Sequence, residues 1–506
     1  MELINNLMLG ASVAFSFWGF FYCLVGVFFG TLIGVLPGVG PLAVISLLLP
    51  ITFNVDPIHS IIMLSGIYYG GAYGGSNTSI LLNMPGSTNT AVTCLDGYPM
   101  TRKGRAGVAL FVTAIGSFIG SMLGLTLLIG FAPELAEFAL MFGPWEYFSL
   151  MILGLVAATL ISSSGPFRSL SAVAIGVTLG LVGTDIYAGT QRFTFGSVNL
   201  FDGLNIAVIA MGLFGVREVI GEAPLLDRPK VETRHISFRS MVPTREDVSR
   251  SWKAILRGSG LGAVIGVLPG AGSTLASFLS YTIEKKVSGH QEEFGKGAIE
   301  GVAGPEAANN AAVQTAFIPT LTMGIPGDAV MALMLAALTI QGIQPGPTLF
   351  TQHQDLFWGV VISFLIGNVL LVVLNLPLIG IWLKVLAIPY EYLYPMIIVF
   401  VAVGAYSINM SLFDVYMAML FGGLGYLFFL LRIDAAALIL GFVLGPLLEH
   451  QLRRAMIISA GDWMSFLQRP LSAMLVVIIA VLLGWMTYSA LRKRRVFAGD
   501  GPGLEG

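Results

Sequence analysis

Long runs of apolar residues without a single charged side chain recur along the chain. The clearest of them cover residues 108–131, 356–383 and 471–491. A helix of roughly 20 apolar residues can cross the hydrocarbon core of a bilayer, so each run is long enough to span a membrane alone. A soluble protein has no interior that could bury so many such runs. The pattern therefore predicts an all-α polytopic membrane protein.

Composition supports this class and excludes others. Of the 506 residues, 56% are hydrophobic and only 11% are charged, whereas soluble domains carry roughly 25% charged residues. The net charge of −2 does not indicate nucleic-acid binding. The two cysteines and five histidines lack metal-ligand spacing, and no nucleotide-binding or nucleophile motif is present. We therefore expect no enzyme activity and no cofactor, with Na⁺ as the one ion left open.

An internal duplication organises the chain. Residues 33–40 read Ile-Gly-Val-Leu-Pro-Gly-Val-Gly, and residues 265–272 repeat them with one change, at an offset of 232. At this offset Asn77 matches Asn309. Further on, the offset becomes 241, where Met84-Pro-Gly-Ser87 resembles Ile325-Pro-Gly-Asp328. Such collinear matches predict two structural repeats.

Loop charges orient the repeats by the positive-inside rule. The basic clusters at 102–105, 217–257, 285–296 and 492–495 are expected in the cytoplasm. The number of membrane crossings between these clusters gives the two repeats opposite orientations, with a periplasmic N-terminus and a cytoplasmic C-terminus. Both flanks of 258–281 are basic, which predicts that this segment enters and leaves on one side. We expect roughly eleven crossings and two re-entrant helical hairpins.

The expected fold is two inverted-topology repeats with re-entrant helical hairpins and broken helices, plus a C-terminal helix. The expected units are a first transmembrane repeat at 1–216, a cytoplasmic linker at 217–257, a second, inverted repeat at 258–450, a C-terminal transmembrane helix at 451–495 and a disordered tail at 496–506. In secondary transporters, interrupted helices at matching places in inverted repeats mark the binding site.

The Pro-Gly-x-Gly segments are the first candidate for such a site. Proline and glycine at this spacing should end one helix and begin another. A new helix N-terminus presents free N–H groups that suit a carboxylate. The candidate substrate-binding residues here are Gly38, Val39, Gly40, Gly270, Ala271, Gly272, Ser273 and Thr274. The two hydroxyl residues have Pro41 and Leu42 as counterparts, so the copies should bind unequally. A kinked helix packed through glycine is the alternative.

Two rows of glycines precede these breaks. The rows are Gly26, Gly30 and Gly34 in the first copy and Gly258, Gly262 and Gly266 in the second. Glycines four apart lie above one another on one helix face and let a neighbouring helix come close. For these rows we expect packing rather than ligand contact.

Polar residues at membrane depth form the second candidate. Four glycines between Gly70 and Gly75 predict a helix break, and Ser76, Asn77, Thr78 and Ser79 follow directly. The matched segment 304–310 carries Asn309 and Asn310. Neutral amides and hydroxyls suit a dehydrated Na⁺ or a carboxylate. We assign Ser76, Asn77, Asn309 and Asn310 to the substrate and Asn77, Thr78, Ser79, Asn309 and Asp328 to a coupling ion. Hydrogen bonding between helices is the alternative.

Two acids are treated differently. Asp328 follows Pro326-Gly327 and precedes an apolar run, so it either caps that helix or serves the coupling ion; its counterpart Ser87 is neutral. Glu306 follows Pro305 near the basic 285–296 segment, and we expect it to be exposed.

Residues 33–40, 68–87, 262–281 and 304–328 together resemble the large membrane subunit of the tripartite tricarboxylate transporters, the TctA family. The resemblance runs from about Leu3 to Leu491. It implies a permease of the bacterial inner membrane, driven by a Na⁺ or H⁺ gradient, that imports a di- or tricarboxylate. It also implies two partners, a small four-helix membrane subunit (TctB-like) and a periplasmic solute-binding protein (TctC-like). A carboxylate channel or a membrane scaffold without ion coupling is the alternative function.

Overall fold

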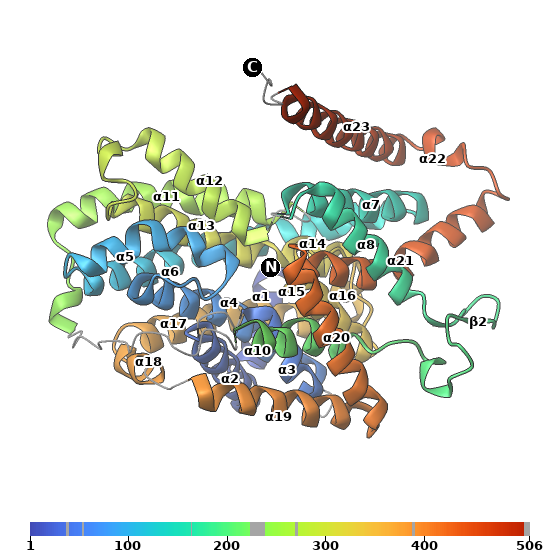
Figure 1. Cartoon of the computed structure of the whole chain (residues 1–506), viewed down its shortest axis with the longest axis horizontal. Coiled ribbons are helices and arrows are strands. Elements are labelled where there is room, and N and C mark those ends of the chain that lie inside the picture. The colour runs from blue at the N-terminus through green and yellow to red at the C-terminus, as the bar shows by residue number, and fades with distance from the viewer. Residues whose placement is uncertain are drawn as a thin grey trace, which may run out of the picture.

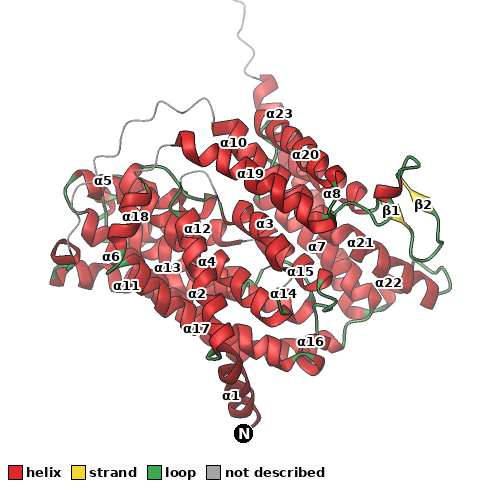
Figure 2. Ribbon diagram, turned by 90° about the horizontal axis from the view of Figure 1, so that it is seen from below, coloured by secondary structure: helices red, strands yellow, loops and turns green. Residues whose placement is uncertain are grey.

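The computed structural model describes residues 1–36, 40–52, 55–162, 164–222, 238–268, 272–386 and 390–499. This part of the chain is almost entirely helical, and its one sheet is a two-stranded antiparallel hairpin. The hairpin projects at the edge of the molecule beyond α21, and α23 lies along the outside of the helical body (Figures 1 and 2). The all-α prediction is confirmed.

The first part of the chain forms several long helices and a series of shorter elements. Its elements are α1 (Glu2–Ala14), α2 (Phe17–Gly34), α3 (Pro41–Thr52), α4 (Pro57–Leu82), the 3-10 helix η1 (Thr88–Thr93), α5 (Cys94–Arg102), α6 (Ala106–Leu140), α7 (Pro144–Ile161), α8 (Pro166–Gly180), β1 (Gly183–Thr184), β2 (Gln191–Arg192), the 3-10 helix η2 (Val198–Leu200), α9 (Ile206–Ala210), the π-helix η3 (Met211–Val216) and α10 (Arg217–Glu222).

The second part begins inside the expected linker, because α11 starts at Arg245. Its elements are the 3-10 helix η5 (Phe238–Met241), α11 (Arg245–Gly266), α12 (Gly272–Val287), the 3-10 helix η6 (Gln291–Glu293), α13 (Glu300–Thr315), α14 (Phe317–Met323), α15 (Ala329–Ile340), α16 (Thr348–Gln352), α17 (Gln354–Asn375), α18 (Ile379–Val385), α19 (Tyr390–Asn409), α20 (Leu412–Leu430), α21 (Ala435–Ile458), α22 (Ser465–Gln468) and α23 (Pro470–Gly499).

Six helices of the described ranges are long and apolar enough to cross a membrane. They are α2, α6, α17, α20, α21 and the 470–488 part of α23. Shorter apolar helices, among them α3, α15 and parts of α7 and α19, accompany them. The apolar run 356–383 is divided, because α17 ends at Asn375 and α18 begins at Ile379. Pro377 between them has no N–H to continue the helix.

The glycine rows pack as expected. A Cβ added at Gly262 would lie 2.0 Å from the backbone oxygen of Ala308, and one at Gly258 would lie 2.1 Å from that of Gly304. The row of α2 meets α4 in the same way, with Gly26 against Met63. At these positions the absent side chain lets two helix backbones touch. The packing prediction is confirmed.

The same contacts correct one repeat match. The row of α2 rests on Met63, Ile67 and Gly71, and the row of α11 rests on Gly304, Ala308 and Ala312. These backbone partners are related by an offset of 241, although the rows themselves are related by 232. Asn309 therefore corresponds to Tyr68, and the predicted match of Asn77 with Asn309 is wrong. The nine extra residues lie in the connection between α12 and α13.

Contacts between helices repeat along with the sequence. Helix α4 contacts α2 and α17, and helix α13 contacts α11 and α6. Helix α3 contacts α15, while α12 contacts η1. Each copy therefore supplies one helix to the other copy's central helix, which ties the two halves into one body. In both views α11, α12 and α13 gather with α5 and α6 on one side (Figures 1 and 2).

The helix breaks fall at one of the two expected places. Helix α2 ends at Gly34 before α3 starts at Pro41, and α11 ends at Gly266 before α12 starts at Gly272. The predicted break at Gly70–Gly75 is wrong, since α4 is helical throughout. Its glycines face α2 and Pro41 at close range. Dense packing of these backbones holds the helix where glycine alone would weaken it.

Helices α11 and α12 fold back on each other. Arg257 of α11 and Glu284 of α12 form an ion pair at 2.5 Å, and Glu284 is buried. The middle of α11 therefore lies beside the last turn of α12. The two helices are in contact, while the re-entrant course expected for residues 258–281 stays a prediction.

Candidate functional site

A turn of the same construction follows α4 and α14. Asn83 ends α4 with a left-handed φ of 57°, and Gly324 ends α14 with a φ of 68°. Residues of this conformation commonly terminate helices. After each Pro-Gly pair, the next element starts at an N-cap residue, Ser87 for η1 and Asp328 for α15. Asp328 accepts a hydrogen bond from the backbone N–H of Met331 at 2.9 Å, which confirms its capping role.

The turn of the first copy reaches into the second copy. The side-chain amide of Asn89 donates hydrogen bonds to Ser273 Oγ at 3.1 Å and to Asn309 Oδ1 at 2.8 Å. The hydroxyls of Thr88 and Thr274 lie 3.1 Å apart. These five residues, which we call the junction, join η1, the first turn of α12 and the middle of α13.

The junction contains an unsatisfied donor. Asn309 is fully buried, and its Nδ2 has no hydrogen-bond acceptor within the described residues. A buried amide without a partner is costly, so such a group is a good candidate to meet a ligand. Gly272, at a positive φ of 61°, begins α12 beside it. Amide N–H, hydroxyl and helix N-terminus are together the donors that a carboxylate needs.

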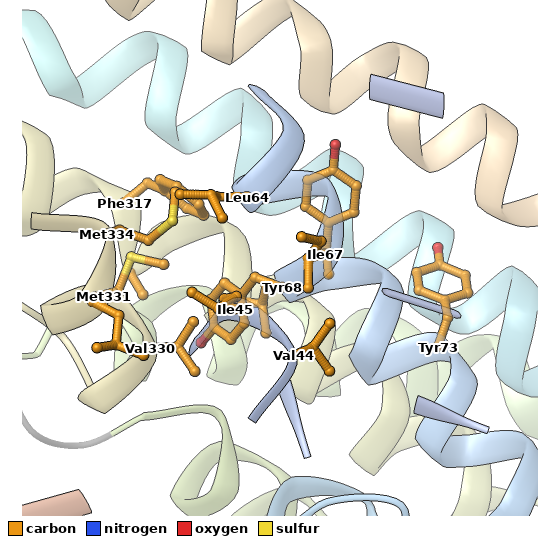
Figure 3. Packing of buried hydrophobic residues seen from close by; sticks show 14 of the residues in the cluster. Val44, Ile45, Leu64, Ile67, Tyr68, Tyr73, Phe317, Val330, Met331 and Met334 are labelled. Carbon is orange, nitrogen blue, oxygen red and sulfur yellow. The ribbon is translucent and has the colours of Figure 1, made fainter. Parts of the chain in front are cut away.

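The second copy's turn meets the first copy in a related way. Tyr68, the counterpart of Asn309, donates a hydrogen bond to Asp328 Oδ2. Figure 3 shows Tyr68 beside Ile45 of α3 and Val330 of α15. Gly272 faces the same acid, because a Cβ added there would lie 3.6 Å from Asp328 Cβ. Asp328 therefore borders the junction.

Several other predicted site residues point elsewhere. Asn77 donates to Asn375 of α17 at 2.6 Å, and Thr78 donates to the backbone oxygen of Val35. Asn310 donates to Ser117 of α6 at 2.8 Å. For these three residues the hydrogen bonds between helices are the ones observed.

Six more of these residues remain to be placed. Ser79 bonds to backbone oxygens of Gly75 and Thr90, whereas a Cβ added at Gly40 would face open space. Predictions for Gly38, Val39, Gly270 and Ala271 lie outside the described residues.

The prediction that Glu306 is exposed is wrong. Its side chain is buried, and its carboxylate accepts hydrogen bonds from Ser76 at 2.6 Å and from Thr93. Pro305 does not expose this part of α13, because the helix continues through it from Glu300 to Thr315. Helices α4, α6, α11 and α12 enclose it instead.

Sequence reasoning missed Thr88, Asn89 and Thr93. They belong to η1, which the pattern did not distinguish from a loop. The run Ser87-Thr-Asn-Thr90 directly after Pro85-Gly86 was the available signal, since such residues favour helix starts. Their contact with α12 and α13 depends on residues more than 180 positions away.

Among the described residues, six apolar helices long enough to span a bilayer define a multi-pass membrane protein. Apolar helices surround a buried polar site that two related helix turns build together. The chain matches the tripartite tricarboxylate transporter TctA family over residues 20–440, and it belongs to that family. TctA proteins are components of tripartite transport systems, which also contain TctB and TctC components, and they are not an enzyme family.

Two relatives come from Agrobacterium vitis. One, described as "Uncharacterized 52.8 kDa protein in TAR-I ttuC' 3'region", is 52% identical over 495 residues, covering 98% of each chain. The other, described as "Uncharacterized protein in TAR-II ttuC' 3'region", is 53% identical over 241 residues, which are 47% of this chain and 100% of that one. The first similarity extends across both copies of the duplication.

Proposed function

We propose that this chain is the permease subunit of a secondary transporter that imports a di- or tricarboxylate. A Na⁺ or H⁺ gradient across the bacterial inner membrane would drive the import. A TctC-like periplasmic binding protein would deliver the substrate, and a TctB-like four-helix subunit would accompany the permease. The observation that carries this proposal is the buried Nδ2 of Asn309 at the junction, which has no hydrogen-bond acceptor among the described residues.

One substrate carboxylate would bind at the junction. Asn309 Nδ2 would donate to it, with hydroxyl donors from Ser273, Thr274 and Thr88, and the N-terminus of α12 would add partial positive charge. The first copy has Pro41 and Leu42 at the matching helix start, so it offers fewer donors. We therefore place the main carboxylate contact in the second copy.

The transport cycle would be a rigid-body movement of the interrupted segments, as in other transporters with inverted repeats. The reciprocal packing of α17 on α4 and α6 on α13 supports a two-fold relation between the copies. The Arg257–Glu284 pair supports a hairpin of α11 and α12 that enters and leaves on one side. Of the five residues assigned to a coupling ion, Asn309 and Asp328 adjoin the junction, and a Na⁺ there would also be near the substrate.

The decisive experiment is uptake by proteoliposomes that contain this chain with both partner subunits. Labelled citrate and succinate are tested against imposed Na⁺ and pH gradients. Accumulation above the outside concentration, dependent on one gradient, supports the proposal. Equilibration without dependence on either gradient indicates a channel, and uptake that survives alteration of the junction indicates a scaffold.

A further inference from the structure

Glu306 differs from the two other buried acids of α12 and α13, Glu284 and Glu300. Glu284 pairs with Arg257, and Glu300 pairs with Arg250 at 2.8 Å. Glu306 has only two hydroxyl groups on its carboxylate, those of Ser76 and Thr93. Within the described ranges no Lys, Arg or His side chain forms an ion pair with it.

The position of Glu306 makes this lack of a cation costly. It lies six residues beyond Glu300 along α13, which is about 9 Å deeper along the helix axis. Its side chain is only 1% exposed. An ionised carboxylate in such a place is strongly disfavoured unless a positive charge or a proton neutralises it. Its counterpart in the first copy is Ser65, which is neutral, so only one copy carries this acid.

The groups that surround Glu306 cannot supply that charge. Tyr73 of α4 and Cys94 of α5 are titratable side chains that interact electrostatically with Glu306. Both are ordinarily neutral at physiological pH. Helix α6 presents Ser117 and Ser121 near this part of α13. Helices α11 and α12 contribute Arg257 and Glu284, which are paired with each other.

We propose that Glu306 binds the cation that drives transport, with Ser76 Oγ and Thr93 Oγ1 as its neighbouring oxygen ligands. The cation is either Na⁺ or H⁺, since both neutralise a carboxylate and both suit a site lined by carboxylate and hydroxyl oxygen atoms. This inference rests on the proposed function and names the site that couples it.

The geometry also links this cation to the substrate. Glu306 and Asn309 are one turn apart on α13, about 4.5 Å along its axis, so an unneutralised Glu306 repels a carboxylate at the junction. Thr93, which bonds to Glu306, ends the same short helix η1 that carries Thr88 and Asn89. Cation binding at Glu306 therefore both removes a repelling charge and positions η1 for the substrate.

Glu306→Gln tests the proposal, because an amide is neutral and can still bond to both hydroxyls. The variant is reconstituted with both partner subunits and compared with wild type for gradient-driven accumulation and for exchange of internal against external citrate. We expect exchange to persist, while accumulation driven by either gradient falls to equality of the two sides. The matched control is Glu246→Gln, at an exposed acid of α11, which should accumulate citrate like wild type.

A second measurement does not depend on transport. The melting temperature of the purified protein is followed in NaCl against choline chloride, and across pH at constant salt, because a ligand of the folded state raises it. A Na⁺-dependent rise that Glu306→Gln abolishes identifies Na⁺. A pH-dependent change that this variant abolishes, without a Na⁺ effect, identifies H⁺. Thr93→Val should weaken the cation effect on melting and reduce accumulation, because it removes one oxygen ligand of the cation together with the link to η1.

Two outcomes would overturn the inference. One is accumulation by Glu306→Gln at the wild-type level, and the other is an identical response of wild type and variant to Na⁺ and pH in the melting experiment. If wild type itself moves no carboxylate, the proposed function fails, and the melting experiment still decides whether Glu306 binds a cation.

Discussion

The side-chain amide of Asn89 donates a hydrogen bond to the side-chain oxygen of Asn309, 2.8 Å away. The two residues belong to different copies of the duplication and are separated by 220 positions. The bond fixes the orientation of the Asn309 amide, so that its Nδ2 is the group left without an acceptor. One short helix of the first copy thus prepares a donor of the second.

Asn309→Ala should therefore weaken substrate binding, and the loss should exceed what reduced stability of the folded protein could cause. A hydrogen bond to a charged group contributes about 1.5–3 kcal/mol, which corresponds to a roughly ten- to hundredfold higher carboxylate concentration for half-maximal uptake. The measurement is the concentration dependence of citrate or succinate uptake in proteoliposomes. Asn368→Ala is the control, because Asn368 is a buried amide of α17 that bonds to Phe364 and Tyr73 away from the junction. Equal uptake curves for the two variants would contradict the assignment.

Gly262→Ala should destabilise the protein, although alanine normally favours helices. The added Cβ would lie 2.0 Å from the Ala308 backbone oxygen, so α11 and α13 must separate. Overpacking of this kind costs about 1–3 kcal/mol. Thermal unfolding in detergent measures the loss. Gly260→Ala on the same helix meets no atom within 4 Å and should melt like wild type or slightly higher; a similar loss in both variants would refute close packing.

Arg257→Ala should leave Glu284 buried without its cation. Breaking a fully buried ion pair costs about 3–5 kcal/mol; the loss should be smaller here, because the Arg257 side chain is 38% exposed. The melting temperature should fall, and adding Glu284→Gln should restore most of it. Lys253→Ala removes an exposed cation one turn earlier and should have almost no effect. If Arg257→Ala melts like Lys253→Ala, the pair does not hold α11 to α12.

Asp96→Ala should release the connection between α12 and α13. One oxygen of Asp96 accepts the backbone N–H groups of Gly295, Gly297 and Ala298 at 2.7–2.9 Å, and the other accepts the Tyr281 hydroxyl. Without the carboxylate these amides lose their acceptor. Hydrogen exchange should accelerate across residues 295–298 and stay slow in the interior of α13.

Glu292→Ala provides the control for this experiment, because Glu292 is an exposed acid of the same connection. Its exchange pattern should match that of wild type. Unchanged protection of residues 295–298 in Asp96→Ala would show that the carboxylate does not anchor this segment.

The repeated sequence segments predicted much of the fold correctly. Helices α2 and α11 end before the two Pro-Gly-x-Gly segments, and α3 and α12 begin at or after their last glycine, as expected for residues that act through their own backbone. The glycine rows likewise predict close packing from their spacing alone. Asp328 was predicted to be either a cap or a coupling residue, and its bond to Met331 shows the cap.

Other features depended on neighbouring helices, which no local sequence pattern identifies. Gly70–Gly75 looked like a break, yet α4 is continuous because α2 packs against its backbone. Glu306 looked exposed beside Pro305, yet four helices enclose it. The match of Asn77 with Asn309 failed because the nine-residue insertion precedes α13, which only the packing of the glycine rows reveals.

By itself, the sequence determined that this is a membrane protein with a duplicated helix interruption, because apolar length and backbone-breaking residues act locally. The tertiary structure decided which polar groups meet. Asn89 reaches Asn309, Tyr68 reaches Asp328, and Glu306 has two hydroxyl partners and no cation among the described residues. Those contacts join residues more than 200 positions apart, and their energies depend on burial that only the packed helices create.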